Sequence, residues 1–364
     1  MTGARVVVTG AAGPLGRRVV ALALADPSVE HVVAIDRTGA ALPTGTRVTP
    51  ISMELTHPDL KAALEGAEAV VHLGVSEPFD AAAGPDAGLD GSGAATGGVD
   101  ATRAVLDAAT AAGVRTMVVL SSAMVYGAWP NNPVPLTEDA PLRPDPALRF
   151  AIEKAEIERL AGEWREERGA HGDTFATVAV LRPTIAVARE SSSWLGRSPW
   201  SPAGVQLHDE EPPAQFVHLD DLASAVDLAR REHLDGPFNV APDGWIPAEQ
   251  LRALSGPAPR LHLPVALAER LGAARLMFGL SRMPASVLPY TRCSWVVAND
   301  RLRAAGWEPT HSNEEAFVEA DEGGMIASLN PKRRQMLSFA VVGAVTAGAI
   351  VGVVALVRRS RRNR

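Results

Sequence analysis

The stretch Arg5-Val-Val-Val-Thr-Gly-Ala-Ala-Gly-Pro-Leu-Gly16 decides the fold of this chain. Its three consecutive valines are typical of a short strand that is buried on both faces. Glycines then recur at every third position, and a proline favours the first turn of a helix. The residues that follow predict that this helix runs from Pro14 to Ala25. A buried strand, a glycine-rich turn and a helix therefore follow one another directly.

The glycine spacing in this context predicts a site for the pyrophosphate of a dinucleotide. Gly10 permits a tight turn, Gly13 lets the backbone approach the phosphates, and Gly16 lets the helix pack on the strand. The pyrophosphate would lie at the helix start, at Pro14 and Leu15, where free N–H groups and the helix dipole favour an anion. A glycine-rich turn that holds no ligand is the alternative.

Asp36 stands twenty residues after Gly16, at the end of the second predicted strand. Its carboxylate is suited to accept hydrogen bonds from ribose hydroxyls and would repel a 2′-phosphate, which favours NAD over NADP. The adjacent Arg37 keeps NADP as the less favoured alternative. The strand, the loop and Asp36 together predict a Rossmann-type domain that holds NAD.

Short apolar runs rich in valine recur along the first half of the chain, separated by stretches with helical spacing. Such runs suit strands buried on both faces, and the spacers suit crossover helices, which predicts a doubly wound parallel α/β sheet. The predicted strands are Val6–Val8, His31–Ile35, Arg47–Ile51, Ala69–Leu73, Thr116–Leu120 and Thr177–Leu181. We expect an NAD-binding domain over residues 1–182, with a flexible Gly/Ala-rich loop at 80–98. A smaller substrate lobe over 183–330 is expected to interleave with this core.

The last segment differs in kind from the rest of the chain. Met336–Val357 holds 22 residues without a charge, which is long enough to span a hydrocarbon core of ~30 Å. Residues 332–364 contain eight bases and no acids. We therefore expect 331–364 to be a basic-flanked, single-pass membrane anchor that contacts lipid, with the globular part in the cytoplasm. A buried C-terminal helix is the alternative, and the arginines after Val357 leave the orientation of the anchor open.

The composition argues against several functional classes. Without the eight bases of the tail, the whole-chain net charge of −7 becomes −15, and an acidic body is a poor nucleic-acid binder. A single cysteine, Cys293, cannot form an internal disulfide and fits a reducing compartment. The nine histidines show no metal-ligand spacing, so we expect no metal centre. No basic and apolar leader stands before Arg5, so we expect no secretory signal.

Further motifs resemble one family in order, over roughly residues 4–310. The Gly-x-x-Gly-x-x-Gly spacing is similar to that of short-chain dehydrogenases, and the later motifs are similar to their extended branch, the NAD-dependent epimerase/dehydratase family. These motifs are Val70–Gly74, Val119–Gly127 with its final Val-Tyr-Gly, Leu181–Pro183, Phe216–Asp221 and Gly236–Val240. The resemblance implies that Leu73 and Gly74 line the cofactor and that a homodimer can form.

The resemblance also implies a catalytic set of a serine or threonine, a tyrosine, and a lysine four residues after the tyrosine. The tyrosine moves a proton while a hydride passes to or from the nicotinamide, and the lysine binds the nicotinamide ribose and lowers the tyrosine pKa. Ser122 and Lys154 match the hydroxyl and the lysine, whereas Phe150 stands where the tyrosine is expected. Gly98 replaces the asparagine of the family's Asn-x-x-Gly-Thr segment, so we expect proton chemistry that does not use this tyrosine.

Other groups are candidates for the proton transfer that a tyrosine at position 150 would perform. They are Ser122, Tyr126, His218 or a group of the substrate. Each of two candidates also has a purely structural alternative. Tyr126 would pack beside the substrate loop, and His218 would be satisfied by local hydrogen bonds. Trp194 and Trp200 could line a substrate pocket or pack the lobe.

Two functional hypotheses remain. The first is a membrane-tethered epimerase/dehydratase-like oxidoreductase that acts on a small molecule, either a sugar nucleotide or a lipid-like alcohol. The second is an NAD-binding sensor or scaffold at the membrane that does not turn over. The intact loop, Ser122 and Lys154 favour retained cofactor binding in both cases, while Phe150 and Gly98 oppose standard catalysis.

Overall fold

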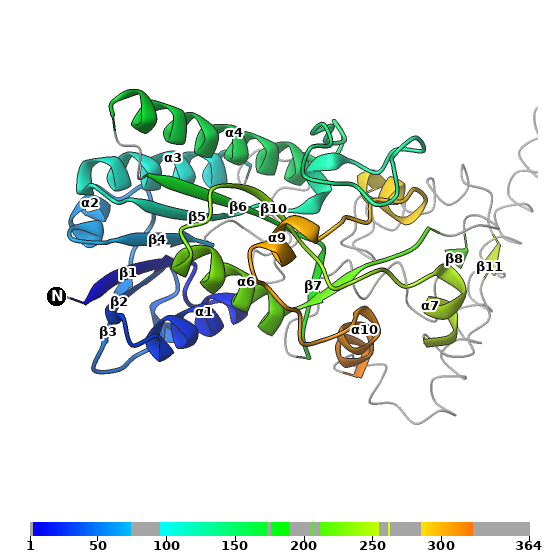
Figure 1. Cartoon of the computed structure of the whole chain (residues 1–364), viewed down its shortest axis with the longest axis horizontal. Helices are drawn as coiled ribbons and strands as arrows, with labels where there is room; N and C mark the ends of the chain where they lie inside the picture. Colours follow the sequence, from blue (N-terminus) through cyan, green and yellow to red (C-terminus); the bar gives the residue numbers. More distant parts are fainter. Residues whose placement is uncertain are drawn as a thin grey trace, which may run out of the picture.

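The computed structural model describes residues 3–73, 95–172, 176–189, 205–206, 212–254, 261–262 and 285–322. Within these ranges, a parallel seven-stranded sheet runs through the molecule in the order β10-β6-β5-β4-β1-β2-β3 (Figure 1). The strands are β1 (Ala4–Thr9), β2 (Val29–Asp36), β3 (Val48–Ser52), β4 (Ala69–His72), β5 (Thr116–Leu120), β6 (Thr177–Pro183) and β10 (Gly236–Val240).

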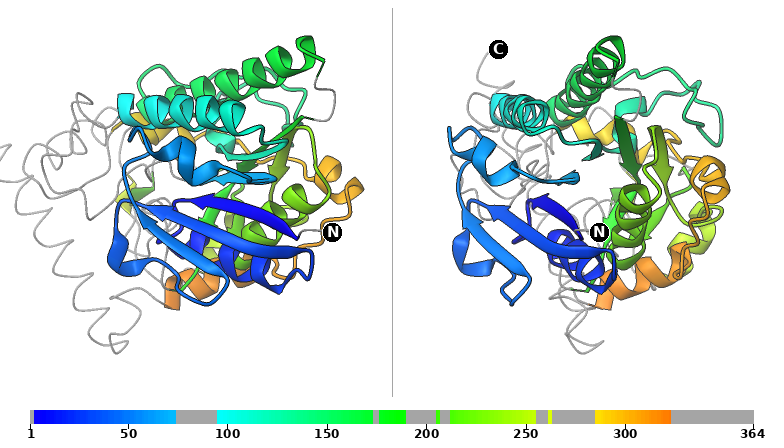
Figure 2. Two further views of the ribbon diagram at one scale, coloured as in Figure 1. Left: turned by 90° about the vertical axis from the view of Figure 1, so that its left-hand side faces the viewer. Right: turned by 60° about the vertical axis from the view of Figure 1, so that its left-hand side comes forward.

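Helices cover both faces of this sheet, as Figure 2 shows in its right-hand view. One face carries α1 (Pro14–Ala25) and α6 (Leu219–Arg231), and the other carries α2 (Leu60–Leu64), α3 (Ala95–Ala112) and α4 (Arg149–Ala170). The alternation of side chains along each strand produces this arrangement, because Val6 and Val8 pack towards α1 and α6 while Val7 packs towards the opposite helices. All three valines are almost completely buried, as strands covered on both sides require.

The structure confirms the predicted doubly wound α/β fold. All six predicted strands are present, with ends that differ by at most two residues, and α1 has the predicted bounds. The predicted loop at 80–98 is wrong at its end, since residues 95–98 form the first turn of α3. Adjacent glycines weaken the intrinsic helix propensity of this turn, so the sequence does not mark it as helical, while later residues of α3 pack against α2 and α4. Residues 74–94, which include the rest of that loop, lie outside the described residues.

The second half of the chain contributes to both the sheet and a smaller cluster. Strand β10 is an edge of the main sheet, and α6 packs directly against α1. The remaining elements are β7 (Ile185–Val187), β8 (Val205–Gln206), β9 (Phe216–His218), α7 (Ala248–Leu254), β11 (Leu261–His262), α9 (Asp300–Ala304) and α10 (Asn313–Glu322), with 3₁₀ turns η1 (Gly39–Ala41), η3 (Ala123–Tyr126) and η4 (Ala285–Thr291). A separate apolar core lies among them, with Phe216 of β9 against Phe317 of α10 at a ring-centroid separation of 5.0 Å.

The predicted membrane segment at 336–357 lies outside the described residues. Among the helices that are described, none combines the length and the apolar character that a membrane crossing requires.

Candidate functional site

The glycine-rich loop between β1 and α1 is built around two positions where no other residue fits. Gly10 has a φ of +75°, a conformation that side chains rarely adopt. A Cβ atom at Gly16 would lie 2.1 Å from the carbonyl oxygen of Gly10 and 2.7 Å from the Cα of Ala11. These two glycines therefore serve the protein itself, because they let the chain turn sharply and bring α1 against the strand.

Gly13 has a different role, because the protein alone does not require a glycine there. It has a φ of −68° as the N-cap of α1, and a Cβ atom would meet only the carbonyl oxygen of Gly10 at 3.5 Å. Pro14 opens the helix, no side chain caps it, and its first turn holds no acid. Leu15 packs partly buried against the core. The helix start thus keeps free N–H groups and an unobstructed approach, which fits the pyrophosphate of a dinucleotide.

Asp36 closes this site at the end of β2. Its two carboxylate oxygens accept hydrogen bonds from the backbone N–H groups of Ala12 and Thr38, each at 3.1 Å. The carboxylate is therefore held beside the glycine loop, where ribose hydroxyls would meet a negative charge. The side chain of Arg37 is 71 % exposed, and its Nε lies 4.0 Å from Glu54. This arrangement fits NAD better than a cofactor with a 2′-phosphate.

The expected catalytic residues meet at the end of β5. Ser122 begins the turn η3, and its Oγ accepts a hydrogen bond from the backbone N–H of Met124 at 3.2 Å. Lys154 is buried in α4 and donates from Nζ to the carbonyl of Leu120 at 3.0 Å. The ring of Phe150 lies one helical turn away, with its centroid 5.4 Å from the same Nζ. The structure therefore places an apolar ring beside the lysine amine, at the position where the sequence resemblance implies a tyrosine.

The other expected site residues are placed as follows. Leu73 is buried directly after β4, and its N–H donates to the carbonyl of Thr9 at 3.2 Å. Gly98 is buried near the start of α3, where its carbonyl accepts from the hydroxyl of Thr102 at 2.9 Å. Gly74, Trp194 and Trp200 lie outside the described residues.

The hydroxyl of Tyr126 forms its hydrogen bonds within a buried polar network of the protein. Its hydroxyl donates to Asn239 at 2.9 Å and accepts from the guanidinium of Arg182 at 2.7 Å. Arg182 is in turn paired with Glu158 at 2.6 Å, and both side chains are 6 % exposed. Burial raises the pKa of Tyr126 to about 12, although the charge of Arg182 opposes this. A hydroxyl that is buried, doubly bonded and hard to ionise is a poor proton carrier at neutral pH.

His72 at the end of β4 links three elements of the core. Its Nδ1 lies 2.8 Å from the hydroxyl of Thr9 in β1, and its Nε2 lies 3.0 Å from the hydroxyl of Thr102 in α3. Burial lowers its pKa to about 3, and the charge of Lys154 acts in the same direction. His72 is therefore neutral and positions the three elements around the site. The sequence contained it in the Val70–Gly74 motif but gave no sign of its partners.

Glu153 is a titratable group that sequence reasoning missed. Its Oε1 atom is buried and has no hydrogen-bond partner among the described residues. Burial raises its pKa to about 6, against the opposing charges of Lys154 and Arg149. Trp164, about three turns further along α4, donates to the carbonyl of Leu106 in α3 at 3.1 Å. Glu153 therefore lies on the side of α4 that faces α3, and the signal in the sequence was an acid directly before Lys154.

The parallel sheet, the glycine loop and Asp36 define a dinucleotide-binding α/β protein. The model of the NAD dependent epimerase/dehydratase family matches residues 6–241, which is more than half of the chain. The chain belongs to this family.

Individual relatives are more distant. An uncharacterized protein of Mycobacterium tuberculosis (strain ATCC 25618 / H37Rv) is 26% identical over 353 residues, which cover 93% of this chain and 89% of the relative. The UDP-glucose 4-epimerase of Thermus thermophilus, solved in complex with NAD, gives a TM-score of 0.62 at 20% identity and covers 87% of this chain and 97% of its own. The Thermotoga maritima UDP-glucose 4-epimerase, solved with UDP-glucose, gives 0.63 at 17% identity with the same coverages. Such structural likenesses establish the fold.

Proposed function

We propose that this protein binds NAD and carries out epimerase- or dehydratase-type redox chemistry on a sugar nucleotide. The observation that supports this best is that the glycine loop follows β1, while Ser122 follows β5 and the buried Lys154 donates to the carbonyl of Leu120 at the end of β5. NAD supplies a hydride acceptor and donor there when bound. The sugar nucleotide is supported by the two epimerases of similar fold, one of which was solved with UDP-glucose. A lipid-like alcohol is the alternative substrate.

Ser122 and Lys154 have separate roles in this proposal. The Ser122 oxygen accepts from Met124, which leaves its proton available to donate to a substrate oxygen. Lys154 keeps a positive charge near the end of β5, where it would hold the nicotinamide ribose and lower the pKa of nearby acids. Asp36 and the start of α1 would hold the adenosine half of the cofactor.

Glu153 is our candidate for the proton step that Phe150 cannot perform. It lies three residues after Phe150 on the same helix, so the two side chains are neighbours, and it lies on the side of α4 that faces α3. A carboxyl group with a pKa of about 6 can take up and return a proton at neutral pH. Tyr126 is unsuited to this task because both its hydrogen-bond partners are internal.

We further propose that residues 336–357 tether the protein to a membrane. The support is the uncharged sequence of this segment and the basic residues on either side of it. In this arrangement the globular part would meet NAD on the cytoplasmic side.

The test uses the full chain in detergent, with NAD and a panel of UDP- and dTDP-sugars together with hydroxysteroids. NADH fluorescence and product mass report turnover in the native chain, Phe150→Tyr, Glu153→Gln and a matched control. Glu156→Gln is that control, since it removes a more accessible acid from the same helix. We expect native turnover that rises as the pH passes upward through about 6, because oxidation of an alcohol needs a group that accepts its proton. Glu153→Gln should lower turnover by roughly 10²-fold, and Glu156→Gln should not.

The outcomes separate the two functional hypotheses. Turnover that survives in Glu153→Gln would overturn the role of Glu153 while leaving an enzyme. Turnover in Phe150→Tyr alone would replace the enzyme with an NAD-binding sensor or scaffold that preserves the substrate site. Failure of the native chain to bind NAD would overturn the whole proposal.

A further inference from the structure

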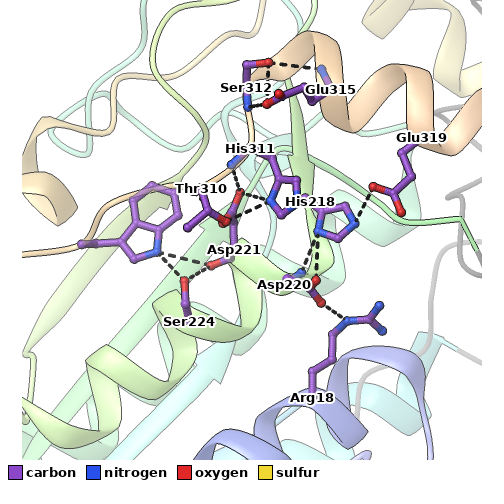
Figure 3. A network of polar contacts seen from close by, with 11 residues as sticks. Arg18, His218, Asp220, Asp221, Ser224, Thr310, His311, Ser312, Glu315 and Glu319 are labelled. Carbon is purple, nitrogen blue, oxygen red and sulfur yellow. Dashed lines mark hydrogen bonds and ion pairs between the residues drawn. The ribbon is translucent and has the colours of Figure 1, made fainter.

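Three side chains from distant parts of the sequence meet between α6 and α10, as Figure 3 shows. His218 precedes α6, His311 precedes α10, and Glu319 lies within α10. One possible ligand atom from each residue lies within 4.8 Å of those from the other two. Among the described residues, these three are the group of His, Cys, Asp or Glu side chains that is close enough to hold a metal ion. The sequence predicted no metal centre, because residues so far apart leave no motif.

His218 is the buried member of this trio. It is 3 % exposed, and its Nε2 atom is buried without a hydrogen-bond partner among the described residues. The same atom lies 3.4 Å from a carboxylate oxygen of Glu319. Ligands about 2.0–2.1 Å from a tetrahedral metal are separated by roughly 3.3–3.4 Å, so this pair has the spacing of two zinc ligands. His311 and Glu319 are partly exposed, which leaves them free to adjust around an ion.

The second histidine is oriented as a metal ligand is. The Nδ1 of His311 lies 3.0 Å from Asp221, a carboxylate that is 1 % exposed. Asp221 is itself fixed by the backbone N–H groups of Thr310 and His311. A buried carboxylate that accepts from one ring nitrogen leaves the other nitrogen free to bind a metal, which is the usual outer-shell arrangement.

We propose that His218, His311 and Glu319 bind a divalent transition-metal ion of the zinc type. Two imidazoles and a carboxylate match the donor set that zinc accepts, and the partly exposed face of the trio leaves a fourth position for water. The Nδ1 of His218 now accepts from the N–H of Asp220 at 3.2 Å. Metal binding through Nε2 requires the imidazole proton on Nδ1, so this hydrogen bond from the Asp220 N–H must break. A carboxylate oxygen of Asp220, 3.6 Å from Nδ1, can then accept the proton's hydrogen bond in its place.

The ion would join parts of the chain that are about a hundred residues apart. It would bind α10 to the start of α6, and Asp220 at that start already pairs with Arg18 of α1. Because the unfolded chain does not hold the three ligands together, binding would stabilise the folded state. This role is independent of the proposed redox function.

The test is metal binding by the full chain, purified without a histidine tag and stripped with a chelator. Titration with Co²⁺ reports a four-coordinate site by its visible absorption, and competition with a chromophoric chelator gives the zinc affinity. His311→Asn keeps a donor for Asp221 but lacks the second ring nitrogen, and Glu319→Gln keeps the size of the side chain. His57→Asn is the control, since His57 is an exposed histidine outside the trio.

We expect one zinc ion per chain, a thermal midpoint that rises with zinc, and at least about tenfold weaker binding in both trio variants. His57→Asn should bind as the native chain does. Absence of Co²⁺ absorption in the native chain would overturn the site and leave only the contact between His218 and Glu319. The site would also be overturned if the trio variants and His57→Asn had the same zinc affinity. Glu319→Gln keeps the test decisive if His311→Asn fails to fold, because Glu319 is partly exposed.

Discussion

Two alanine substitutions in the same loop are expected to separate folding from cofactor binding. In Gly16→Ala, the new Cβ would lie 2.1 Å from one backbone atom and 2.7 Å from another, so the backbone must move. In Gly13→Ala, the nearest atom would be 3.5 Å away, which is an ordinary contact, and the φ of −68° suits alanine. The two changes add the same methyl group three residues apart.

The expected magnitudes follow from these contacts. Overpacking against fixed neighbours costs about 1–3 kcal/mol, which we expect Gly16→Ala to lose from the free energy of unfolding. In Gly13→Ala, the free energy of unfolding rises by about 0.4–1 kcal/mol because the unfolded chain loses conformational freedom. The variant loses about 0.5–1 kcal/mol because alanine is a poorer N-cap than glycine, so its stability should change by less than about 0.5 kcal/mol. The same overpacking applied to bound pyrophosphate weakens NAD binding roughly tenfold to a hundredfold.

The assay is urea unfolding followed by calorimetric titration with NAD for both variants and the native chain. We expect Gly16→Ala to be destabilised, and Gly13→Ala to fold normally while it binds NAD weakly. Native NAD affinity in Gly13→Ala would refute the placement of the pyrophosphate at the start of α1. An equal loss of stability in both variants would refute the distinction between the two glycines.

Three further predictions concern buried charge and cofactor choice. Arg182→Met should cost about 3–5 kcal/mol in urea unfolding, because Glu158 would be left buried without its partner, and adding Glu158→Gln should recover part of this. His72 has a folded pKa of about 3 against about 6.5 unfolded, so the unfolded chain binds a proton that the folded chain does not. Between about pH 6.5 and pH 3, His72 should therefore lower stability by about 1.4 kcal/mol for each unit that the pH falls, and unfolding of His72→Gln should show a slope smaller by this amount. Asp36→Ser should shift the ratio of NADP to NAD affinity upward by at least about tenfold in titrations, because the carboxylate that repels a 2′-phosphate is gone.

The fold was predictable because its signals are local. Strands buried on both faces are continuous apolar runs, so their positions could be predicted to within two residues. The start of α3 was missed for the opposite reason. The Ala95–Gly98 turn holds two adjacent glycines and has poor intrinsic helix propensity, so no local signal in the sequence marks it as helical.

Candidate site residues could be named from the sequence only where they form motifs. Ser122, Lys154 and Asp36 could be named because each has a fixed spacing from a recognisable neighbour. The partners of Tyr126 could not, since its hydroxyl meets Asn239 across 113 positions of sequence. Hydrogen bonds of this kind are set by the order of strands in the sheet, which brings the carboxyl ends of β6 and β10 together.

In the proposed function, Lys154 acts on a carboxyl group beside Phe150. The sequence resemblance implies a tyrosine at position 150 whose pKa the lysine charge would lower. Here burial raises the pKa of Glu153, and the charge of Lys154 is the largest influence that opposes this rise, so the pKa stays near 6. A carboxyl group in the same burial without that lysine would be protonated over a wider range of pH and would be a weaker proton acceptor. In the proposed function, the charge of Lys154 therefore serves the carboxyl group of Glu153 in the way that the resemblance implies for a tyrosine.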